Sequence, residues 1–177
     1  MESNLPKRKN TRMTGVDYNQ TGVYFITVCT AGRRCMLSFV HGLGESRDPM
    51  LTPVGGKVTL ELTAYGTIVD ETITRMNETY PDVQITNYVI MPNHVHLLIF
   101  IKKDADNTTG KSYSGCNSTI SRHISTFKRF VNKQIGENIW QSRSYDHIIR
   151  SNDDLENHVS YINYNPTNWY NDEMYCE

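Results

Sequence analysis

The sequence predicts an α+β protein with a ferredoxin-like, split βαβ arrangement, in which an antiparallel sheet carries helices on one face and an added C-terminal helix follows. Three observations lead to this fold class. The predicted elements follow one another as strand, helix, strand, strand, helix, strand. The two middle strands are joined by only two residues, Pro92 and Asn93, which implies an antiparallel pair. The 177 residues suit one domain, residues 1–177, with a sizeable core.

The first strand and the first helix are predicted in the N-terminal half. The segment Val23–Thr30, VYFITVCT, is β-branched and aromatic, which favours a buried strand. Gly42–Gly56 is rich in Gly, Pro and Asp, and we expect an irregular connection there. Apolar residues then recur at helical spacing from about Lys57 to Met76, which predicts the first helix; they are Leu62, Tyr65, Ile68 or Val69, and Ile73.

Two strands and a second helix are predicted in the middle of the chain. The strands cover Val83–Met91 and His94–Ile101, on either side of the two-residue connection. Residues 102–117 are polar and rich in Gly, Ser and Thr, so we expect a mobile loop. The second helix is expected over Ser118–Ile135, with an apolar stripe of Ile120, Ile124, Phe127 and Val131.

The last strand and an added helix are predicted near the C-terminal end. Ile139–Arg150, IWQSRSYDHIIR, is a plausible last strand. Ser151 with Asp154 resembles a capping box and begins a helix that runs to about Asn165, where a proline ends it.

Charge is segregated along the chain although its net value is only −1. Residues 1–34 hold six basic and two acidic residues, a net charge of +4, and residues 102–150 have a net charge of +5. Residues 151–177 have a net charge of −6. Basic blocks of this size can neutralise several phosphates, although a solvated surface is the simpler explanation for either block taken alone.

The compartment predicted from the sequence is the cytoplasm. No apolar stretch reaches the length of a membrane span, and the start, MESNLPKRKN, lacks the apolar region of a signal peptide. The four cysteines show no CxxC spacing, which argues against a cysteine zinc site.

His94 and His96 are the most informative residues, because they lie in the apolar segment YVIMPNHVHLLIFI. Strand side chains alternate, so both imidazoles project from one face and Val95 and Leu97 from the other. Burying two such rings without partners costs several kcal/mol, which a divalent metal would offset. Two hydrogen-bonded core histidines are the simpler alternative. A histidine-triad nucleotide hydrolase is a second one, but its third histidine position is occupied here by Leu98.

The predicted final helix offers the second half of a site. Tyr161 and Asn165 are four residues apart and share one flank of the helix, with His158 one turn before the tyrosine. The Asn165 amide oxygen is a hard ligand, and a mixed nitrogen and oxygen set without thiolate suits Mg²⁺ or Mn²⁺ better than structural zinc, which is not excluded. Seen alone, such a Tyr/Asn pair is ordinary packing.

Three motifs occur together in this order: PNHVHLL, WQSRSYDHIIR and HVSYINYNP. Their combination closely resembles the single-tyrosine HUH transposases, and REP-associated tyrosine transposases most of all, from about Val16 to Trp169. The resemblance implies that His94 and His96 are metal ligands, that Asn165 is the third ligand and that Tyr161 is the nucleophile. It also implies a ferredoxin-like fold. The other histidines considered match no catalytic position of the family; they are His123, His147 and His158.

By this resemblance we expect a metal-dependent enzyme that cleaves and rejoins single-stranded DNA near hairpins through a 5′-phosphotyrosine, with Mg²⁺ or Mn²⁺ as cofactor. The chain would act as a monomer or homodimer. A non-catalytic protein that binds hairpin DNA is the main alternative. Residues 1–15 are expected to form a flexible basic arm, for which a solubilising tail is the competing explanation. The candidate DNA contacts are Lys7, Arg8, Lys9, Arg12, Arg33, Arg34, Arg122, Arg129 and Lys133.

Overall fold

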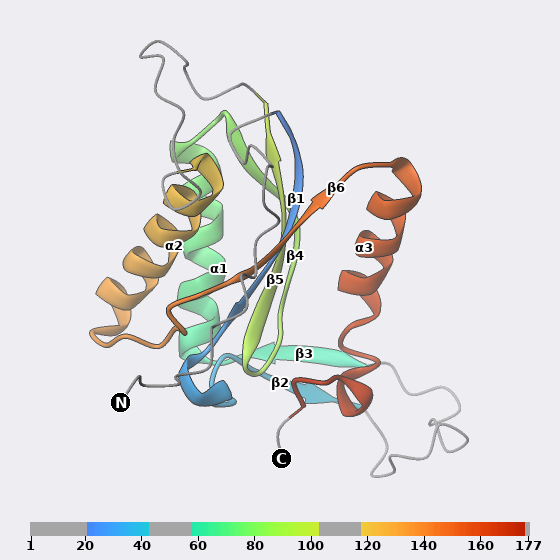
Figure 1. The fold of residues 1–177 in the computed structure, drawn as a ribbon. Helices are drawn as coiled ribbons and strands as arrows, with labels where there is room; N and C mark the ends of the chain where they lie inside the picture. The colour runs from blue at the N-terminus through green and yellow to red at the C-terminus, as the bar shows by residue number, and fades with distance from the viewer. Residues whose placement is uncertain (1–20, 43–57, 103–117, 176–177) are drawn as a thin grey trace, which may run out of the picture.

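Four antiparallel strands form the main sheet, in the spatial order β4-β5-β1-β6 (Figure 1). The computed structural model describes residues 21–42, 58–102 and 118–175. The strands cover Gly22–Cys29 (β1), Val83–Ile90 (β4), His94–Ile101 (β5) and Tyr145–Ile149 (β6). This order and the alternation with helices confirm the ferredoxin-like α+β fold predicted from the sequence.

Three longer helices cover the two faces of this sheet. Helices α1 (Ala64–Thr79) and α2 (Thr119–Ile135) lie on one face, and α3 (Asn152–Tyr164) lies on the other (Figure 1). Each begins after a hydroxyl side chain that accepts a hydrogen bond from a backbone N–H of the first turn, as expected of an N-cap. These caps are Thr63, Ser118 and Ser151.

The start predicted for the first helix is wrong. Thr59–Leu62 is a strand, β3, which pairs with β2 (Ser38–His41) in a separate two-stranded sheet. The apolar spacing of this segment fits a helix, but pairing with a strand far away in the sequence decides its structure, and α1 begins only after Thr63. Most of the predicted irregular connection, residues 43–56, lies outside the described residues.

The predicted last strand is too long. Only Tyr145–Ile149 pairs with β1, whereas Trp140 forms an isolated bridge with Thr30 and is buried in the core. The apolar pair Ile139 and Trp140 therefore reflects core packing rather than a strand.

Two apolar clusters fill the two faces of the sheet. The larger contains Val95, Leu97 and Ile99 of β5 together with residues of α1 and α2. The smaller combines Phe25 and Leu98 of the sheet with apolar residues that follow β6, among them Ile162 of α3 and Trp169 of the short 3₁₀ helix η3 (Trp169–Asn171). Because residues i and i+2 share a face, His94 and His96 lie on the side of Leu98, facing α3.

The arm expected at residues 1–15 and all but the first residue of the loop expected at residues 102–117 lie outside the described residues. In the part of the chain that the structure describes, no helix combines the length and apolar character needed to cross a membrane.

Candidate metal and nucleophile site

Strand β5 places His94 and His96 next to one another on the α3 face of the sheet. Their ring centroids lie 4.5 Å apart, and the side chains are 0% and 1% exposed. Their neighbours on β1 are Cys29 and Thr27. The predicted common face of the two imidazoles is thus present in the structure.

One nitrogen of each imidazole is held by a hydrogen bond. His94 Nδ1 lies 2.8 Å from Asn93 Oδ1, and His96 Nδ1 lies 2.9 Å from Thr27 Oγ1. The Asn93 amide nitrogen donates to the Met174 carbonyl at 2.6 Å, so its oxygen is the atom that accepts from His94. Protonation of His94 at Nδ1 leaves its lone pair on Nε2, as binding of a metal through Nε2 requires, and the Thr27 hydroxyl can accept in the same way from His96 Nδ1.

Three buried polar atoms of this site have no hydrogen-bond partner among the described residues. They are His94 Nε2, His96 Nε2 and Asn165 Oδ1. Such an atom costs about 1–3 kcal/mol when it stays unpaired. Two imidazole nitrogens and an amide oxygen are all suitable metal ligands, so the donor set fits a divalent cation.

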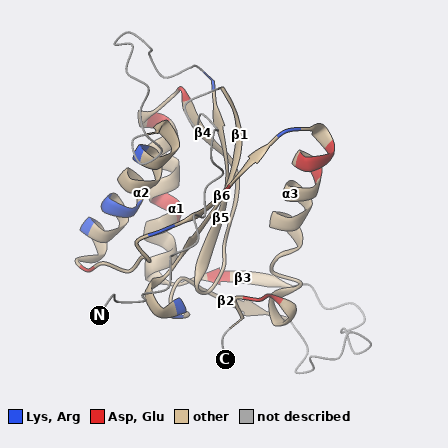
Figure 2. Ribbon diagram, in the orientation of Figure 1, with Lys and Arg blue, Asp and Glu red and all other residues tan. Residues whose placement is uncertain are grey.

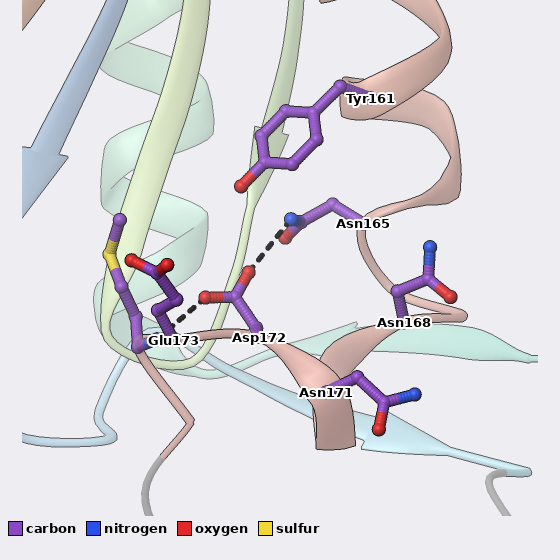
Figure 3. A pocket seen from close by; sticks show the side chains of 7 residues that line it. Tyr161, Asn165, Asn168, Asn171, Asp172 and Glu173 are labelled. Atoms are coloured by element: carbon purple, nitrogen blue, oxygen red, sulfur yellow. Dashed lines mark hydrogen bonds between the residues drawn. The ribbon is translucent and has the colours of Figure 1, made fainter. Parts of the chain in front are cut away.

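Asn165 is oriented by a residue that the sequence interpretation missed. Asn165 follows the last turn of α3, is 2% exposed, and donates from Nδ2 to Asp172 Oδ2 at 3.0 Å (Figure 3). The other oxygen of Asp172 accepts from the backbone N–H of Met174 at 2.7 Å. A ligand atom of Asp172 also lies within 4.8 Å of those of His94 and His96. No motif marks Asp172 in the sequence.

Tyr161 lies one turn before Asn165 and projects from α3 toward the same side (Figure 3). Its ring is 44% exposed and lies edge-on to the ring of His96, with 5.1 Å between the centroids. The ring of Phe25 also lies edge-on to Tyr161, with 6.0 Å between the ring centroids. One chain therefore brings the predicted nucleophile and the paired imidazoles together.

Burial sets the protonation of these groups. Burial lowers the pKa of His94, although the Asp172 carboxylate and the Asn165 side chain act in the opposite direction. The pKa of His96 is lowered further, by burial first and then by the neighbouring imidazoles. Burial and the charge of Asp172 raise the pKa of Tyr161. At neutral pH both imidazoles are neutral, as ligands must be, and the phenol keeps its proton.

Tyr161 lies between two pockets. One has a volume of about 510 Å³ and is lined by polar residues, among them Asn165, Asn168 and Asp172 (Figure 3). The other has a volume of about 440 Å³ and is more aromatic; its lining includes Phe25, Tyr145 and His158. A chain molecule such as a nucleic acid strand can approach the phenol from either side.

The predicted DNA contacts fall into three groups. Arg33 ends the 3₁₀ helix η1 (Ala31–Arg33) and Arg34 follows it, and both side chains are exposed. The positive charge of Arg33 contributes to lowering the pKa of His94. The α2 residues are exposed on the opposite side of the sheet from α3 (Figure 2); they are Arg122, Arg129 and Lys133. The remaining four lie outside the described residues; they are Lys7, Arg8, Lys9 and Arg12. All nine assignments stay predictions.

Comparisons with known proteins agree with this geometry. An uncharacterized protein of Haemophilus influenzae is 27% identical over 184 residues, which covers 96% of this chain and 94% of that protein. A REP-associated tyrosine transposase of Escherichia coli is 30% identical over 83 residues, 47% of this chain and 44% of its own length. A solved structure of a REP-associated tyrosine transposase bound to a REP hairpin covers 90% of this chain and 73% of its own, with a TM-score of 0.57 and 21% identity.

The family assignment rests on a longer match. The family model described as "Transposase IS200 like" matches residues 63–165, more than half of the chain. This stretch contains all four predicted site residues, from the histidines of β5 to the end of α3. The resemblance to tyrosine transposases found in the sequence is confirmed, and the chain belongs to the IS200-like transposase family.

Proposed function

We propose that this protein is a metal-dependent transposase or endonuclease that cleaves and rejoins single-stranded DNA through Tyr161. The observation that carries the proposal is the proximity of a partly exposed phenol to three unpaired buried donor atoms within one chain. Family membership supports the proposal. In addition, a packing role alone would not explain why three metal-ligand atoms of one site stay unpaired.

His94, His96 and Asn165 are the residues that would hold the metal, through Nε2, Nε2 and Oδ1. When bound, Mg²⁺ or Mn²⁺ would neutralise charge on the scissile phosphate and help to orient it. Thr27, Asn93 and Asp172 keep these ligands in a productive orientation through their hydrogen bonds.

Tyr161 would supply the nucleophile. The phenol loses its proton and its oxygen forms a bond to phosphorus, while the bond from phosphorus to the 3′ oxygen breaks. The products are a 5′-phosphotyrosine and a free 3′-OH, and attack by another 3′-OH reverses the step and joins new ends. Tyrosine is a weak nucleophile, because a pKa of about 10 leaves only about one phenol in 10³ ionised at neutral pH. The proposed metal would offset this weakness by neutralising charge on the phosphate.

The DNA partner proposed is a single strand that carries a hairpin. The structural neighbour was solved with a REP hairpin, and the two pockets beside Tyr161 leave the phenol accessible to a strand. The positive charge of Arg33 lowers the pKa of His94, and we propose that this guanidinium contacts the backbone of a bound strand. A cytoplasmic location and a monomeric or dimeric state remain part of this proposal.

A covalent-adduct assay tests the function. The protein is incubated with labelled hairpin oligonucleotides and Mn²⁺, and denaturing gels reveal protein–DNA adducts. Tyr161→Phe should abolish the adduct and leave hairpin binding nearly intact. Tyr164→Phe, on the same helix and 64% exposed, is the matched control and should form the adduct.

Two outcomes would contradict the proposal. Adducts that survive Tyr161→Phe would remove the tyrosine from the chemistry. Tight hairpin binding with no adduct in Mg²⁺ or Mn²⁺ would favour the non-catalytic alternative.

A further inference from the structure

A second cluster of ligand-type side chains lies where β6 meets the start of α3. It consists of His147 on β6 and of Asp154 and His158 on α3, with side chains that are 36%, 25% and 22% exposed. None of them is a proposed metal ligand or nucleophile of the site described above, although His158 lines the aromatic pocket beside Tyr161. Their ligand atoms all lie within 4.8 Å of one another.

The separations within this cluster are close to those around a small metal ion. His147 Nε2 lies 3.0 and 3.2 Å from the two carboxylate oxygens of Asp154, and His158 Nδ1 lies 3.1 Å from Oδ1. A tetrahedral zinc ion with bonds of about 2.1 Å holds its ligand atoms about 3.4 Å apart. Shifts of a few tenths of an ångström would therefore admit the ion.

The carboxylate between the two imidazoles is held in position. The backbone N–H of Arg150 donates to Asp154 Oδ2 at 3.1 Å, and the N–H of Asp154 itself is bonded to the Ser151 hydroxyl. The hydrogen bond from His147 lowers the pKa of Asp154, which keeps it ionised. The centroids of the two imidazole rings lie 4.9 Å apart, with 16° between the ring planes. Each ring directs one nitrogen at the Asp154 carboxylate.

We propose that His147, Asp154 and His158 form a second metal site, for a divalent ion of the zinc class, separate from the site of the paired histidines on β5. The ligands are Nε2, a carboxylate oxygen and Nδ1, and a water molecule completes the set. His158 Nδ1 lies 2.8 Å from the backbone carbonyl oxygen of Asp154; when the ion binds through Nδ1, the ring carries its proton on Nε2 and this hydrogen bond is given up.

The position of this site gives it a consequence for α3. His147 belongs to the edge strand β6, whereas Asp154 and His158 belong to α3, so a bound ion ties the helix to the sheet. His158 also lines the aromatic pocket that contains His96 and Tyr161. The proposal does not depend on DNA cleavage, because none of the three ligands is Tyr161 or a proposed ligand of the β5 site.

Zinc stoichiometry tests the proposal. The whole chain is titrated with Zn²⁺ by calorimetry, and thermal unfolding is recorded with and without the ion. His147→Ala should bind one ion fewer than the wild type and lose part of the Zn²⁺-dependent rise in melting temperature. His41→Ala, which removes a half-exposed histidine of the β2–β3 sheet, is the control and should keep the wild-type count.

A second comparison separates the two sites. Asn165→Ala should weaken binding at the β5 site and leave the ion at His147, whereas Asp154→Asn should have the opposite effect. If circular dichroism shows that His147→Ala does not fold, His147→Gln is used in its place. Equal ion counts and affinities for the wild type and the His147 variant would overturn the proposal and leave an ion-pair cluster only.

Discussion

The Asp172 carboxylate accepts a hydrogen bond of 3.0 Å from the amide nitrogen of Asn165. Because an amide that donates from its nitrogen to a carboxylate has only its oxygen left as an acceptor, this bond fixes which way round the amide lies. The oxygen that results is one of the three unpaired buried donors of the site. Asp172 therefore acts on the proposed metal site through Asn165.

Removal of this carboxylate should weaken metal binding. Asp172→Ala frees the Asn165 amide to rotate, and we expect the affinity for Mn²⁺ to fall about 10–100-fold, as is usual when a ligand loses its supporting hydrogen bond. Titration calorimetry measures the change. Asp172→Asn keeps an acceptor oxygen and should recover part of the affinity, and the neighbouring Glu173→Gln is the control. An unchanged affinity in Asp172→Ala would refute the orienting role.

Thr27 should matter for a similar reason on the opposite side of the site. Thr27→Val keeps the shape of the side chain and removes the hydroxyl that lies 2.9 Å from His96 Nδ1. The imidazole can then turn or change its tautomer, and we expect about tenfold weaker Mn²⁺ binding with little loss of adduct formation at saturating metal. Thr86→Val, on the edge strand β4 of the same sheet, is the matched control. Equal losses in both variants would indicate a general effect on the sheet.

The protein should lose stability in mild acid. Burial lowers the pKa of His123 from 6.5 to about 4, so the unfolded chain takes up a proton that the folded chain refuses. The stability is complete above pH 6.5 and declines as the pH falls toward 4, by about 3 kcal/mol for this residue. His94 and His96 act in the same direction.

Urea unfolding at several pH values checks this behaviour. His123→Gln cannot titrate, and its stability should depend less steeply on pH between 6.5 and 4 than that of the wild type. Identical slopes for the two proteins would rule out His123 as a source of the acid sensitivity.

Gly66 should not tolerate a side chain. A Cβ atom at this position, in the first turn of α1, would collide with the backbone carbonyl oxygen of Leu37. That oxygen also accepts hydrogen bonds from Thr63, so it cannot move freely. Gly66→Ala should lower the free energy of unfolding, measured with urea, by about 1–3 kcal/mol. Gly22→Ala, whose new atom would make only an ordinary contact with Tyr24, should change the stability little.

Local patterns were sufficient for most of the fold. The presence of the four strands, the cap of α3 and the face shared by His94 and His96 follow from alternation, a capping residue and turn length. The β2–β3 sheet could not be predicted in this way, because its strands are short and are stabilised by each other across a long connection. For the same reason the helical spacing before Thr63 was misleading.

The residues of the candidate site also differ in whether the sequence alone could reveal them. Tyr161, Asn165 and the histidines could be recognised because each lies in a motif on a regular element. Asp172 could not, since its role depends on the chain turning back after η3 so that its carboxylate meets Asn165. Thr27 and Asn93 act through cross-strand and turn contacts, which single residues in a sequence do not announce.

The segment after α3 is bonded at several points to residues beside the proposed metal site. The Met174 carbonyl accepts from Asn93, and the Glu173 carbonyl accepts from Arg33. Affinity tags and fluorescent fusions joined to the carboxyl end would therefore load a segment that supports the proposed metal site. Trimming the chain after Asn168, a tempting shortcut for crystallisation, would remove Asp172 and with it the hydrogen bond that orients Asn165, the proposed third ligand.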